Sequence, residues 1–285
     1  METKRIWGLI ILVVLVLSLV AAAYSIIVGP QLESEQNKQT ITTNYTLTDA
    51  QMTGINQVNV KFNGNTTGAN VKFQNKSDNL YNITIEREQG STEPTVTYTQ
   101  NGDVLNVDIS LDSGSADITL GNRCTYNADL ESKVGGFGLY LNNQGKIDNL
   151  NTTIKYIGGG ILLLGDTTFN DINMNINMGG VMIQTLSDKL KSSGTINTNV
   201  QIGGVTMQLQ PSDNLGFKVK GTYDLGGFTF NPDEFNVLSN NTTTTEIETP
   251  DYNNKSAQIQ MESTVGLGGI NINMFYMPME MFQEE

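Results

Sequence analysis

The sequence predicts an all-β protein, a stacked β-solenoid or β-roll with Gly-Gly coil repeats, preceded by one N-terminal transmembrane helix. Three observations predict this fold class. An apolar residue followed by two glycines occurs six times, apolar and polar residues alternate from residue 54 onward, and no stretch after Gly29 has helical periodicity over three turns. Repetition at a regular spacing is typical of architectures in which each unit buries its apolar face against the next.

The first element is the apolar segment at the N-terminus. Lys4 and Arg5 precede an almost unbroken, uncharged apolar run over residues 6–29. A helix of about 23 residues spans roughly 35 Å, which is enough to cross the hydrocarbon core of a membrane. Because the basic residues lie on the N-terminal side, residue 1 is expected in the cytoplasm and the chain after Gly29 outside it. Residues 1–29 are therefore predicted to be a single-pass anchor in the cell membrane, with an extracytoplasmic C-terminal domain.

A cleaved signal peptide is the alternative interpretation of the same segment. The run Ala21-Ala22-Ala23 resembles a cleavage site with small residues. The apolar run continues through Val28, which is longer than the apolar region of most signal peptides and favours an uncleaved anchor. Both interpretations place the rest of the chain outside the cytoplasm.

The next elements are a polar tether and an N-terminal β region. Residues 30–50 form the tether, with a first strand near Thr40–Leu47, and residues 51–104 alternate cleanly. We expect strands with one buried face that are joined by hairpin-type turns. The expected strands are 58–62, 71–73, 81–85 and 96–98, and the expected turns are Asn63-Gly64-Asn65, Ser77-Asp78-Asn79 and Asn101-Gly102-Asp103.

Residues 105–274 form the Gly-Gly repeat. The first five copies recur every 21 to 24 residues, and the sixth follows 42 residues after the fifth. Glycine accepts positive φ and leaves room for a neighbouring coil, which explains why a pair of glycines recurs at each change of direction. The copies are Val134-Gly135-Gly136, Ile157-Gly158-Gly159, Met178-Gly179-Gly180, Ile202-Gly203-Gly204, Leu225-Gly226-Gly227 and Leu267-Gly268-Gly269.

Alternation after each glycine pair predicts two buried ladders of side chains. Residues two apart on a strand share a face, so equivalent positions should stack from coil to coil. The residues before each pair share that face only if the glycines turn the chain. The extra Gly160 in the second copy suggests a one-residue bulge. The predicted ladders are Phe137, Val181, Val205, Phe228 and Ile270, and then Leu139, Ile183, Met207, Phe230 and Ile272.

The C-terminal part of the repeat is expected to be irregular. Residues 235–256 are rich in Asn and Thr and predict an exposed insertion loop, either tolerated or used for binding. Residues 275–285 are rich in Met and aromatic residues. This tail is interpreted as a cap for the end of the solenoid, with an adhesive contact site as the alternative.

Composition excludes several kinds of site. The 285-residue chain has a net charge of −13 and no histidine. Nucleic acid is therefore not an expected partner, and His-dependent catalysis and His-ligated metals are excluded. The copies lack the Asp of calcium-binding coils. Cys124 is interpreted as a small buried hydrophobe, and we expect no catalytic residues, no cofactor and no metal.

Asparagine is unusually frequent, with 33 residues, and many copies precede Thr or Ser by two positions. Such sequons are N-glycosylation acceptors when they are exposed outside the cytoplasm. Composition alone explains most of them, so glycosylation is a secondary hypothesis. The candidates are Asn44, Asn65, Asn75, Asn82, Asn151, Asn240, Asn241 and Asn254.

The stretch over residues 105–273 resembles the toastrack family of bacterial and archaeal envelope proteins, which are also labelled as candidate adhesins and include the C-terminal domains of Lia-type envelope stress proteins. The resemblance rests on Val104–Ile109 before Ala116–Gly121 and on the Gly-Gly strand pairs. It implies a stacked β-solenoid and an envelope-associated, non-catalytic role, and it assigns no functional residues.

The functional expectation follows from architecture and location. We expect a membrane-anchored extracytoplasmic module for adhesion, scaffolding or sensing that binds another envelope protein or a wall polymer. An extracellular carbohydrate-active enzyme is the alternative, since β-solenoids also support such enzymes, and a purely structural spacer is a third hypothesis. The sequence leaves the oligomeric state open.

Overall fold

The computed structural model describes residues 39–186, 190, 192–210 and 212–275. These residues form thirteen strands of one continuous sheet and a single 3-10 turn, η1 (Tyr252–Asn254). No helix in this described part is long and apolar enough to cross a membrane. The predicted anchor over residues 1–29 lies outside the described residues.

The strands fall into a long and a short class. The short ones are β1 (Thr40–Thr48), β3 (Asn79–Glu88), β4 (Thr95–Asn101), β11 (Asn236–Asn240) and β12 (Thr244–Glu248). The long ones are β2 (Gln57–Phe73), β5 (Val104–Leu120), β6 (Thr125–Leu141), β7 (Lys146–Leu164), β8 (Thr168–Thr185), β9 (Gly194–Leu209), β10 (Leu215–Thr229) and β13 (Ala257–Met274).

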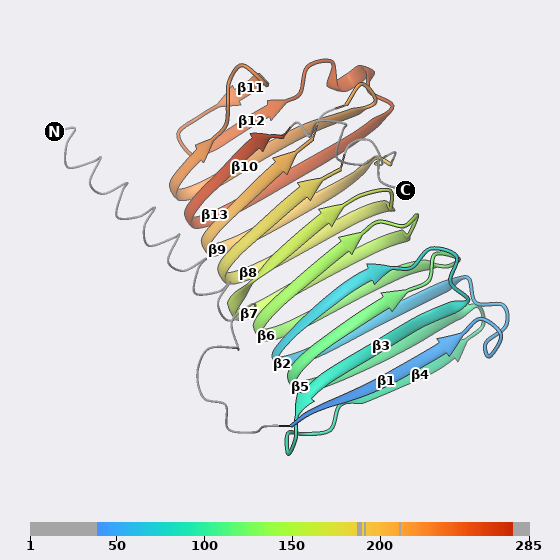
Figure 1. The fold of residues 1–285 in the computed structure, drawn as a ribbon. Coiled ribbons are helices and arrows are strands. Elements are labelled where there is room, and N and C mark those ends of the chain that lie inside the picture. The colour runs from blue at the N-terminus through green and yellow to red at the C-terminus, as the bar shows by residue number, and fades with distance from the viewer. Residues whose placement is uncertain (1–38, 187–189, 191, 211, 276–285) are drawn as a thin grey trace.

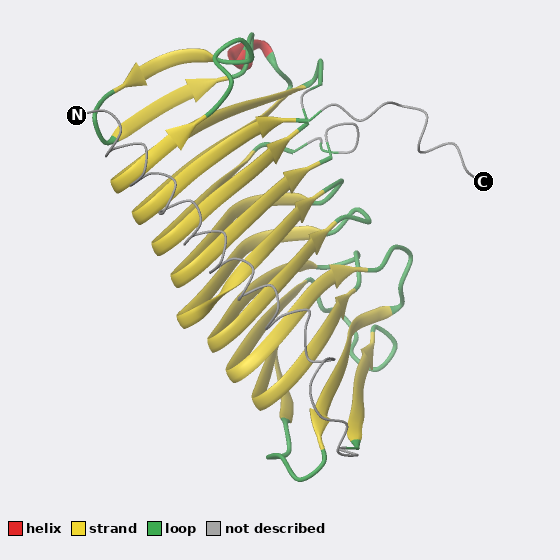
Figure 2. Cartoon of the chain, turned by 60° about the vertical axis from the view of Figure 1, so that its left-hand side comes forward, coloured by secondary structure: helices red, strands yellow, loops and turns green. Residues whose placement is uncertain are grey.

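Each long strand bends in its middle, so that its two halves face each other across the core (Figure 1). In β8, Ile172, Met174 and Ile176 are buried before the glycine pair, and Val181 and Ile183 are buried after it. In a straight strand, the buried residues before and after the glycine pair would point to opposite faces. Because the strand bends at the glycines, both sets point into the core. Figure 2 shows the bent strands stacked, with most connecting loops along the edge opposite the bends. The all-β prediction is confirmed, and the stack is consistent with a solenoid.

Close contact between layers explains the glycine pairs. The first glycine of each pair has a positive φ, for example 143° at Gly179. A Cβ atom added to Gly179 would lie 1.6 Å from the carbonyl oxygen of Gly158 in the layer below. The same contact repeats from Gly158 onto Gly135 and from Gly203 onto Gly179. Only glycine combines this backbone conformation with so close an approach.

The predicted ladders are confirmed inside the stack. Leu139, Ile183, Met207 and Ile272 are fully buried and follow one another in register, with Leu162 between the first two. Phe228 and Phe230 are partly buried, pack against the core and contact each other edge to face. The residues that directly precede the glycine pairs are not buried in the way that the two ladders are. Ile157 and Leu225, for example, lie at the outside of the bend and are exposed.

The order of the layers differs from the order of the sequence at both ends. β13 lies between β9 and β10 and is parallel to both, so the sixth copy stacks between the fourth and the fifth (Figure 1). Likewise β2 lies between β5 and β6. A strand from the 51–104 region is therefore part of the same stack as residues 105–274.

The expected turn at Asn63-Gly64-Asn65 is wrong, because these residues belong to one continuous strand, β2. Asn63 and Gly64 remain paired with both β5 and β6. The segment bends the strand around the core edge without reversing its direction, so both halves stay parallel to the same neighbours. Ser77-Asp78-Asn79 likewise makes no hairpin, because β3 pairs with β5 rather than with β2. The turn at Asn101-Gly102-Asp103 does join the antiparallel pair β4 and β5.

The one-residue bulge predicted at Gly160 lies at another position of β7. Gly160 pairs with Phe137 and Val181 and so occupies a ladder position. The extra residue lies before the glycines instead, since the register shifts between Ile154 and Ile157. A Cβ on Gly160 would lie 2.5 Å from the Cε atom of Met174, whose side chain fills this space.

The insertion loop expected over residues 235–256 is also wrong, because this segment forms the antiparallel strands β11 and β12. β12 continues the sheet beside the first half of β10. The Thr-rich stretch suits a strand because Thr is β-branched, and Thr245 and Ile247 turn inward and are buried. At the other end β4 and β3 pair with β5, and β1 pairs with β3. Residues 276–285, most of the predicted tail or cap, lie outside the described residues.

Candidate interaction surface

The outer face of the stacked first halves carries rows of amide and hydroxyl side chains. Because successive residues alternate between the two faces of a strand, the polar residues between the buried ones point outward. Register then aligns Asn151, Asn173 and Asn197 in one row, and Thr153, Asn175 and Asn199 in the next. We call these six residues on β7, β8 and β9, together with Asn177 and Gln201, the amide grid.

One row of the amide grid is a hydrogen-bonded ladder. Asn197 Nδ2 donates to Asn173 Oδ1 and Asn173 Nδ2 donates to Asn151 Oδ1, each over 2.9 Å. An amide side chain has two N–H donors and two acceptor lone pairs. The ladder uses one donor and one acceptor of Asn173, so it fixes the orientation of the amide and leaves it able to bind a further group.

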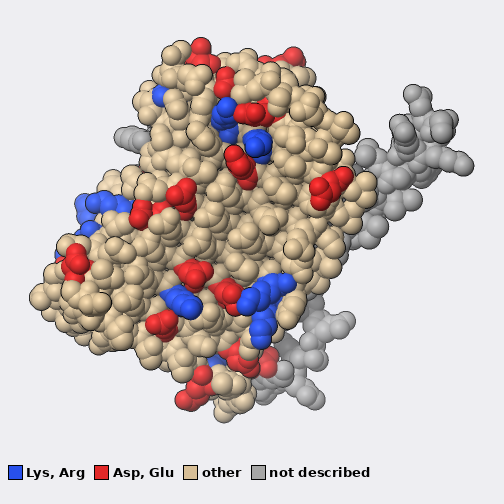
Figure 3. Space-filling model, turned by 180° about the vertical axis from the view of Figure 1, so that it is seen from behind, with Lys and Arg blue, Asp and Glu red and all other residues tan. Residues whose placement is uncertain are grey.

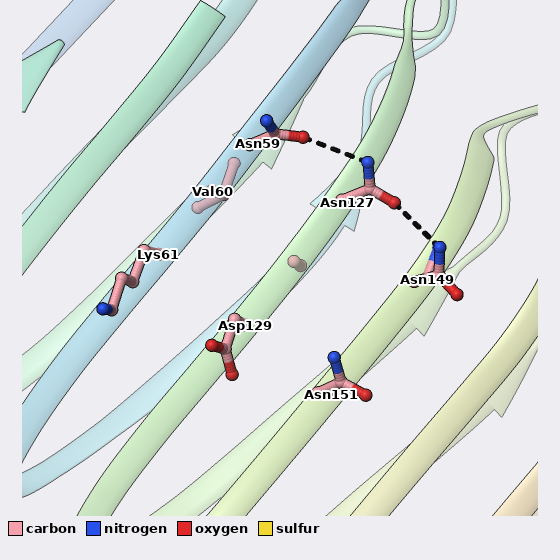
Figure 4. Close-up of a pocket in the computed structure, with 8 residues that line it drawn as sticks. Asn59, Val60, Lys61, Asn127, Asp129, Asn149 and Asn151 are labelled. Carbon is pink, nitrogen blue, oxygen red and sulfur yellow. Dashed lines mark hydrogen bonds between the residues drawn. The ribbon is translucent and has the colours of Figure 1, made fainter. Parts of the chain in front are cut away.

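A second ladder lies on the same face, nearer the N-terminal end. Asn59 Nδ2 donates to Asn106 Oδ1 over 2.9 Å, and Asn127 Nδ2 donates to Asn59 Oδ1 over 3.0 Å. Asn149 Nδ2 donates in turn to Asn127 Oδ1 over 3.3 Å. Figure 4 shows Asn59, Asn127 and Asn149 side by side on neighbouring strands.

Two shallow hollows lie on this face. The first has a volume of about 270 Å³ and is shown in Figure 4, with Lys61 and Asp129 beside the asparagines. The second has a volume of about 300 Å³ and is lined by Lys155 and by five residues of the amide grid, namely Thr153, Asn175, Asn177, Asn199 and Gln201. The first lies over β2, β6 and β7 and the second over β7, β8 and β9, so together they cover a band of this face from β2 to β9. The band suits an extended ligand better than a small enclosed one.

Carboxylates border the amide grid but do not enter it. Asp129 pairs in register with Asn151, and Glu262 of β13 with Asn197. Lys155 forms a salt bridge with Glu131, which balances the charge beside the grid. Figure 3 shows this face with charged clusters toward both ends of the stack and an uncharged expanse between them. For a chain with a net charge of −13, this is an unusually neutral surface.

The outer face of the second halves is more apolar. Tyr140 pairs in register with Leu163, and Ile161 with Met182. These side chains are partly exposed, and Tyr140 exposes 37% of its surface. The two outer faces of the stack therefore differ in chemistry.

The predicted sequons are spread over the molecule. Asn82 and Asn151 are half-buried, and the other six candidates are exposed. Asn151 is itself part of the amide grid and accepts the hydrogen bond of Asn173. Their glycosylation stays a prediction. The structure brings the candidates together in no common site.

Cys124 is buried, as predicted, and its thiol donates to the carbonyl oxygen of Ile55 over 3.3 Å. Burial raises the pKa of this thiol, which keeps it protonated and unreactive. Within the described residues no group of three or more Asp, Glu and Cys side chains could hold a metal ion.

Sequence reasoning missed the amide grid because it attributed the asparagines to composition. A local signal was present. Asn173, Asn175 and Asn177 recur every second residue, and Asn197, Asn199 and Gln201 repeat that spacing one layer later. Strand periodicity alone places each set on one face.

Comparison with known proteins bears on the fold. No family model and no curated protein sequence matches the chain. A solved structure from Clostridium sporogenes, provisionally named a cell adhesion protein, is 13% identical and has a TM-score of 0.53, with coverage of 83% of this chain and 100% of that one. At this identity the likeness shows the fold alone.

Two further solved structures, both provisionally named adhesins, match less closely. The one from Bacteroides fragilis is 12% identical with a TM-score of 0.28, covering 83% of this chain and 98% of that one. The one from Parabacteroides merdae is 14% identical with a TM-score of 0.25, covering 84% and 98%. Membership in the Lia-type group stays a prediction.

Proposed function

We propose that the chain is an extracytoplasmic adhesion, scaffold or sensor-accessory module, anchored in the membrane by residues 6–29. It contacts a wall polymer or another envelope protein through its amide face and catalyses no reaction. The observation that carries the proposal is the amide grid, a neutral surface on a rigid stack in a strongly acidic chain. The fold that it shares with the Clostridium sporogenes structure supports the same kind of role.

The chemistry of the hollows supports a non-catalytic role. Glycoside hydrolysis requires two carboxyl groups that flank the scissile bond. The first hollow contains one carboxylate, Asp129, and the second contains none among its lining residues. Amides and hydroxyls can bind and orient a ligand, but they are poor general acids and bases at neutral pH. A carbohydrate-active enzyme is therefore the less favoured function.

Topology is tested on intact cells that express the full chain. A membrane-impermeant maleimide should label Asn271→Cys, at an exposed position of β13, without lysis. Thr3→Cys should react only after the membrane is permeabilised, because residue 1 is expected in the cytoplasm. The unaltered chain, whose single cysteine is buried, is the control for background. Labelling of Thr3→Cys but not Asn271→Cys on intact cells would refute the extracytoplasmic assignment.

Binding is tested by sedimentation of the purified full chain with isolated bacterial cell walls. We expect the chain to sediment with the walls and to release no soluble sugar. Release of reducing sugar ends would instead support the enzyme. No sedimentation, together with no partner after photo-crosslinking from position 175 on intact cells, would overturn the adhesion and scaffold roles.

A further inference from the structure

We propose that the amide grid binds a neutral N-acetylated glycan, a polymer whose sugar units carry acetamido groups. The inference rests on the proposed function, because it names the chemical class of the polymer that the module would hold. It depends on three features of the grid: the hydrogen-bonding groups that the ladder leaves available, the absence of charge, and the spacing of the strands.

The first feature is the hydrogen-bonding capacity of the ladder. Asn173 donates one N–H to Asn151 and accepts one hydrogen bond from Asn197. Its second N–H and its second lone pair are not needed by the ladder. An acetamido group presents one N–H and one carbonyl oxygen, which is the complementary set. A sugar hydroxyl can make the same contacts singly, but an acetamido group offers both a donor and an acceptor in fixed geometry.

The row beside the ladder adds accessible amides. Asn175 and Asn199 are exposed and pair in register on β8 and β9. Their side chains lie at the second hollow together with Asn177 and Gln201. A ligand seated there would meet amides from two adjacent layers at once, with the hydroxyl of Thr153 on a third.

The second feature is charge. Asp171 lies next to the grid on β8, and Glu262 pairs in register with Asn197. These carboxylates would repel an anionic polymer such as a uronic acid chain or a polyphosphate. A neutral polymer meets no such penalty over the grid, where the adjacent Lys155 is already paired with Glu131.

The third feature is spacing. Neighbouring strands lie about 4.8 Å apart, so equivalent amides repeat at that distance across the stack. This is close to the length of one sugar unit in an extended chain, and the two hollows together cover this face from β2 to β9. Since the hollows are shallow, each sugar binds weakly and affinity comes from several units together. The occupant is therefore a polymer rather than a monosaccharide.

The test compares two hexasaccharides by isothermal titration with the full chain, in a detergent that has no sugar headgroup. Hexa-N-acetylchitohexaose and cellohexaose share the same linkage and differ in the group at carbon 2, acetamido or hydroxyl. We expect saturable binding of the N-acetylated probe and at least about five-fold weaker binding of cellohexaose, since each lost hydrogen bond contributes on the order of 1 kcal/mol. Equal binding of the two probes would overturn the assignment to N-acetylated glycans.

Two matched double variants locate the site. Asn175→Ala with Asn199→Ala should weaken binding of the N-acetylated probe at least about five-fold, because both amides lie on the grid. Asn271→Ala with Asn273→Ala removes two exposed amides from the opposite face of the stack and should leave binding unchanged. Unchanged circular dichroism shows that each variant is folded.

Three further results would overturn the inference: no saturable binding, equal loss in both double variants, or a dimer in sedimentation velocity that the 175/199 variant alone disrupts. The last result would assign the grid to contact between copies of the chain. The topology and wall-binding experiments are independent of the probe, so failure here leaves the proposed function standing if those succeed.

Discussion

At the scale of single residues, the stack depends on the first glycine of each pair. Its positive φ turns the strand, and the missing side chain admits the carbonyl oxygen of the layer below. β2 is the exception, because Thr67 occupies the position that pairs with Gly135. Thr67 is buried, and the carbonyl oxygen of Thr67 is the atom that a Cβ on Gly135 would strike. Each layer from β6 upward therefore needs its glycine, and β5 on the other side of β2 has its own, Gly114, with a φ of 123° and an added Cβ 2.2 Å from the carbonyl oxygen of Glu86.

We predict that Gly203→Ala prevents folding or lowers the free energy of unfolding by more than about 3 kcal/mol. Its Cβ would lie 1.6 Å from the carbonyl oxygen of Gly179, at a φ of 141°. The matched control is Gly227→Ala, where nothing lies within 4 Å of the added Cβ, and its effect should stay within about 1 kcal/mol. Urea unfolding of the full chain measures both. Equal effects of the two substitutions would contradict the close-contact explanation.

Tyr126 gives a pH-dependent prediction at the same scale. Its hydroxyl donates to the carbonyl oxygen of Leu80 over 2.8 Å, and burial raises its pKa above the ordinary range. Burial also raises the pKa of Tyr81 to about 12, with a smaller contribution from Tyr98. The side chain of tyrosine in an unfolded chain ionises at about pH 10. The stability that these neutral phenols contribute is therefore complete below about pH 10 and is lost as the pH rises through the folded-state values.

Tyr126→Phe should lower the free energy of unfolding by about 1 kcal/mol at pH 7, because the carbonyl of Leu80 loses the stronger of its two donors and keeps the N–H of Gly121. Above pH 10 the variant should lose stability less steeply than the unaltered chain, since one buried ionisation is removed and Tyr81 remains. Urea unfolding at pH 7, 9 and 11 measures both effects. Parallel declines of the two proteins above pH 10 would exclude a role for Tyr126 ionisation.

At the scale of elements, the alternation of apolar and polar residues predicted most strands and both buried ladders, because the sequence shows directly which residues of a strand share a face. The positions of β2 and β13 could not be predicted in this way. Each Gly-Gly copy is nearly equivalent to the others, so local pattern does not say which copy is its neighbour. The turn residues near Gly64 were equally compatible with a hairpin and with a bend, and only packing across the core decides between them.

The amide grid could be recovered only in part from sequence. The two-residue spacing of its asparagines was visible in the sequence, but the neutrality of the grid depends on which strands lie beside β7, β8 and β9. Register places Asn175 next to Asn199, and β13 brings Glu262 to the border of the grid. These are long-range pairings that no local motif encodes.

A pair of buried hydroxyl groups links each inserted strand, β2 and β13, to one of its neighbours. Thr198 of β9 and Ser263 of β13 lie 2.7 Å apart, and Thr67 of β2 and Ser132 of β6 lie 3.1 Å apart. All four side chains are buried. An alternative neighbour would separate these pairs and leave the hydroxyl of Thr198 without its partner in the core, which is costly. The pairs therefore favour the observed order of layers over the order of the sequence.

Ser263→Ala should destabilise the chain by about 1–3 kcal/mol, because the hydroxyl of Thr198 stays buried after losing its partner. Adding Thr198→Val removes that orphaned hydroxyl. The double variant should then be more stable than the sum of the single effects predicts, by about 1 kcal/mol. Urea unfolding of the four proteins in this cycle measures the coupling. Strict additivity would mean that the two hydroxyls do not interact.

At the scale of the whole molecule, a strand from a distant part of the chain is inserted between two other strands toward each end of the stack. β2 can pair with β5 and β6 only after both have been synthesised. β13 is synthesised after β9 and β10 and then pairs with both of them. In the part of the chain that the structure describes, β10 pairs with β13 on one side and with β12 on the other, so strand pairing joins β10 and β12 to the rest of the sheet through β13. Closure of such long-range contacts is slow and costs entropy before the layers pack. The final strand therefore controls the integrity of the C-terminal third.

We predict that a chain ending at Asn254 loses β10 to β12 from the stack, because among the described strands β13 alone pairs with both β9 and β10. The loss exposes the apolar edge of β9 and should exceed the few kcal/mol that keep a domain folded, giving aggregation or rapid proteolysis. A chain ending at Phe275 keeps every described strand and is the control. Limited proteolysis and circular dichroism compare the two.

A synthetic peptide of residues 257–274 completes this test. Added during refolding of the chain that ends at Asn254, it supplies β13 in trans and should restore protease resistance to residues 215–248. Aligned glycines and the buried pair of Ser263 with Thr198 specify its register between β9 and β10. A peptide with Gly268→Ala should fail, since its Cβ would lie 1.6 Å from the carbonyl oxygen of Gly203. Full resistance without any peptide would show that the C-terminal layers do not need the inserted strand.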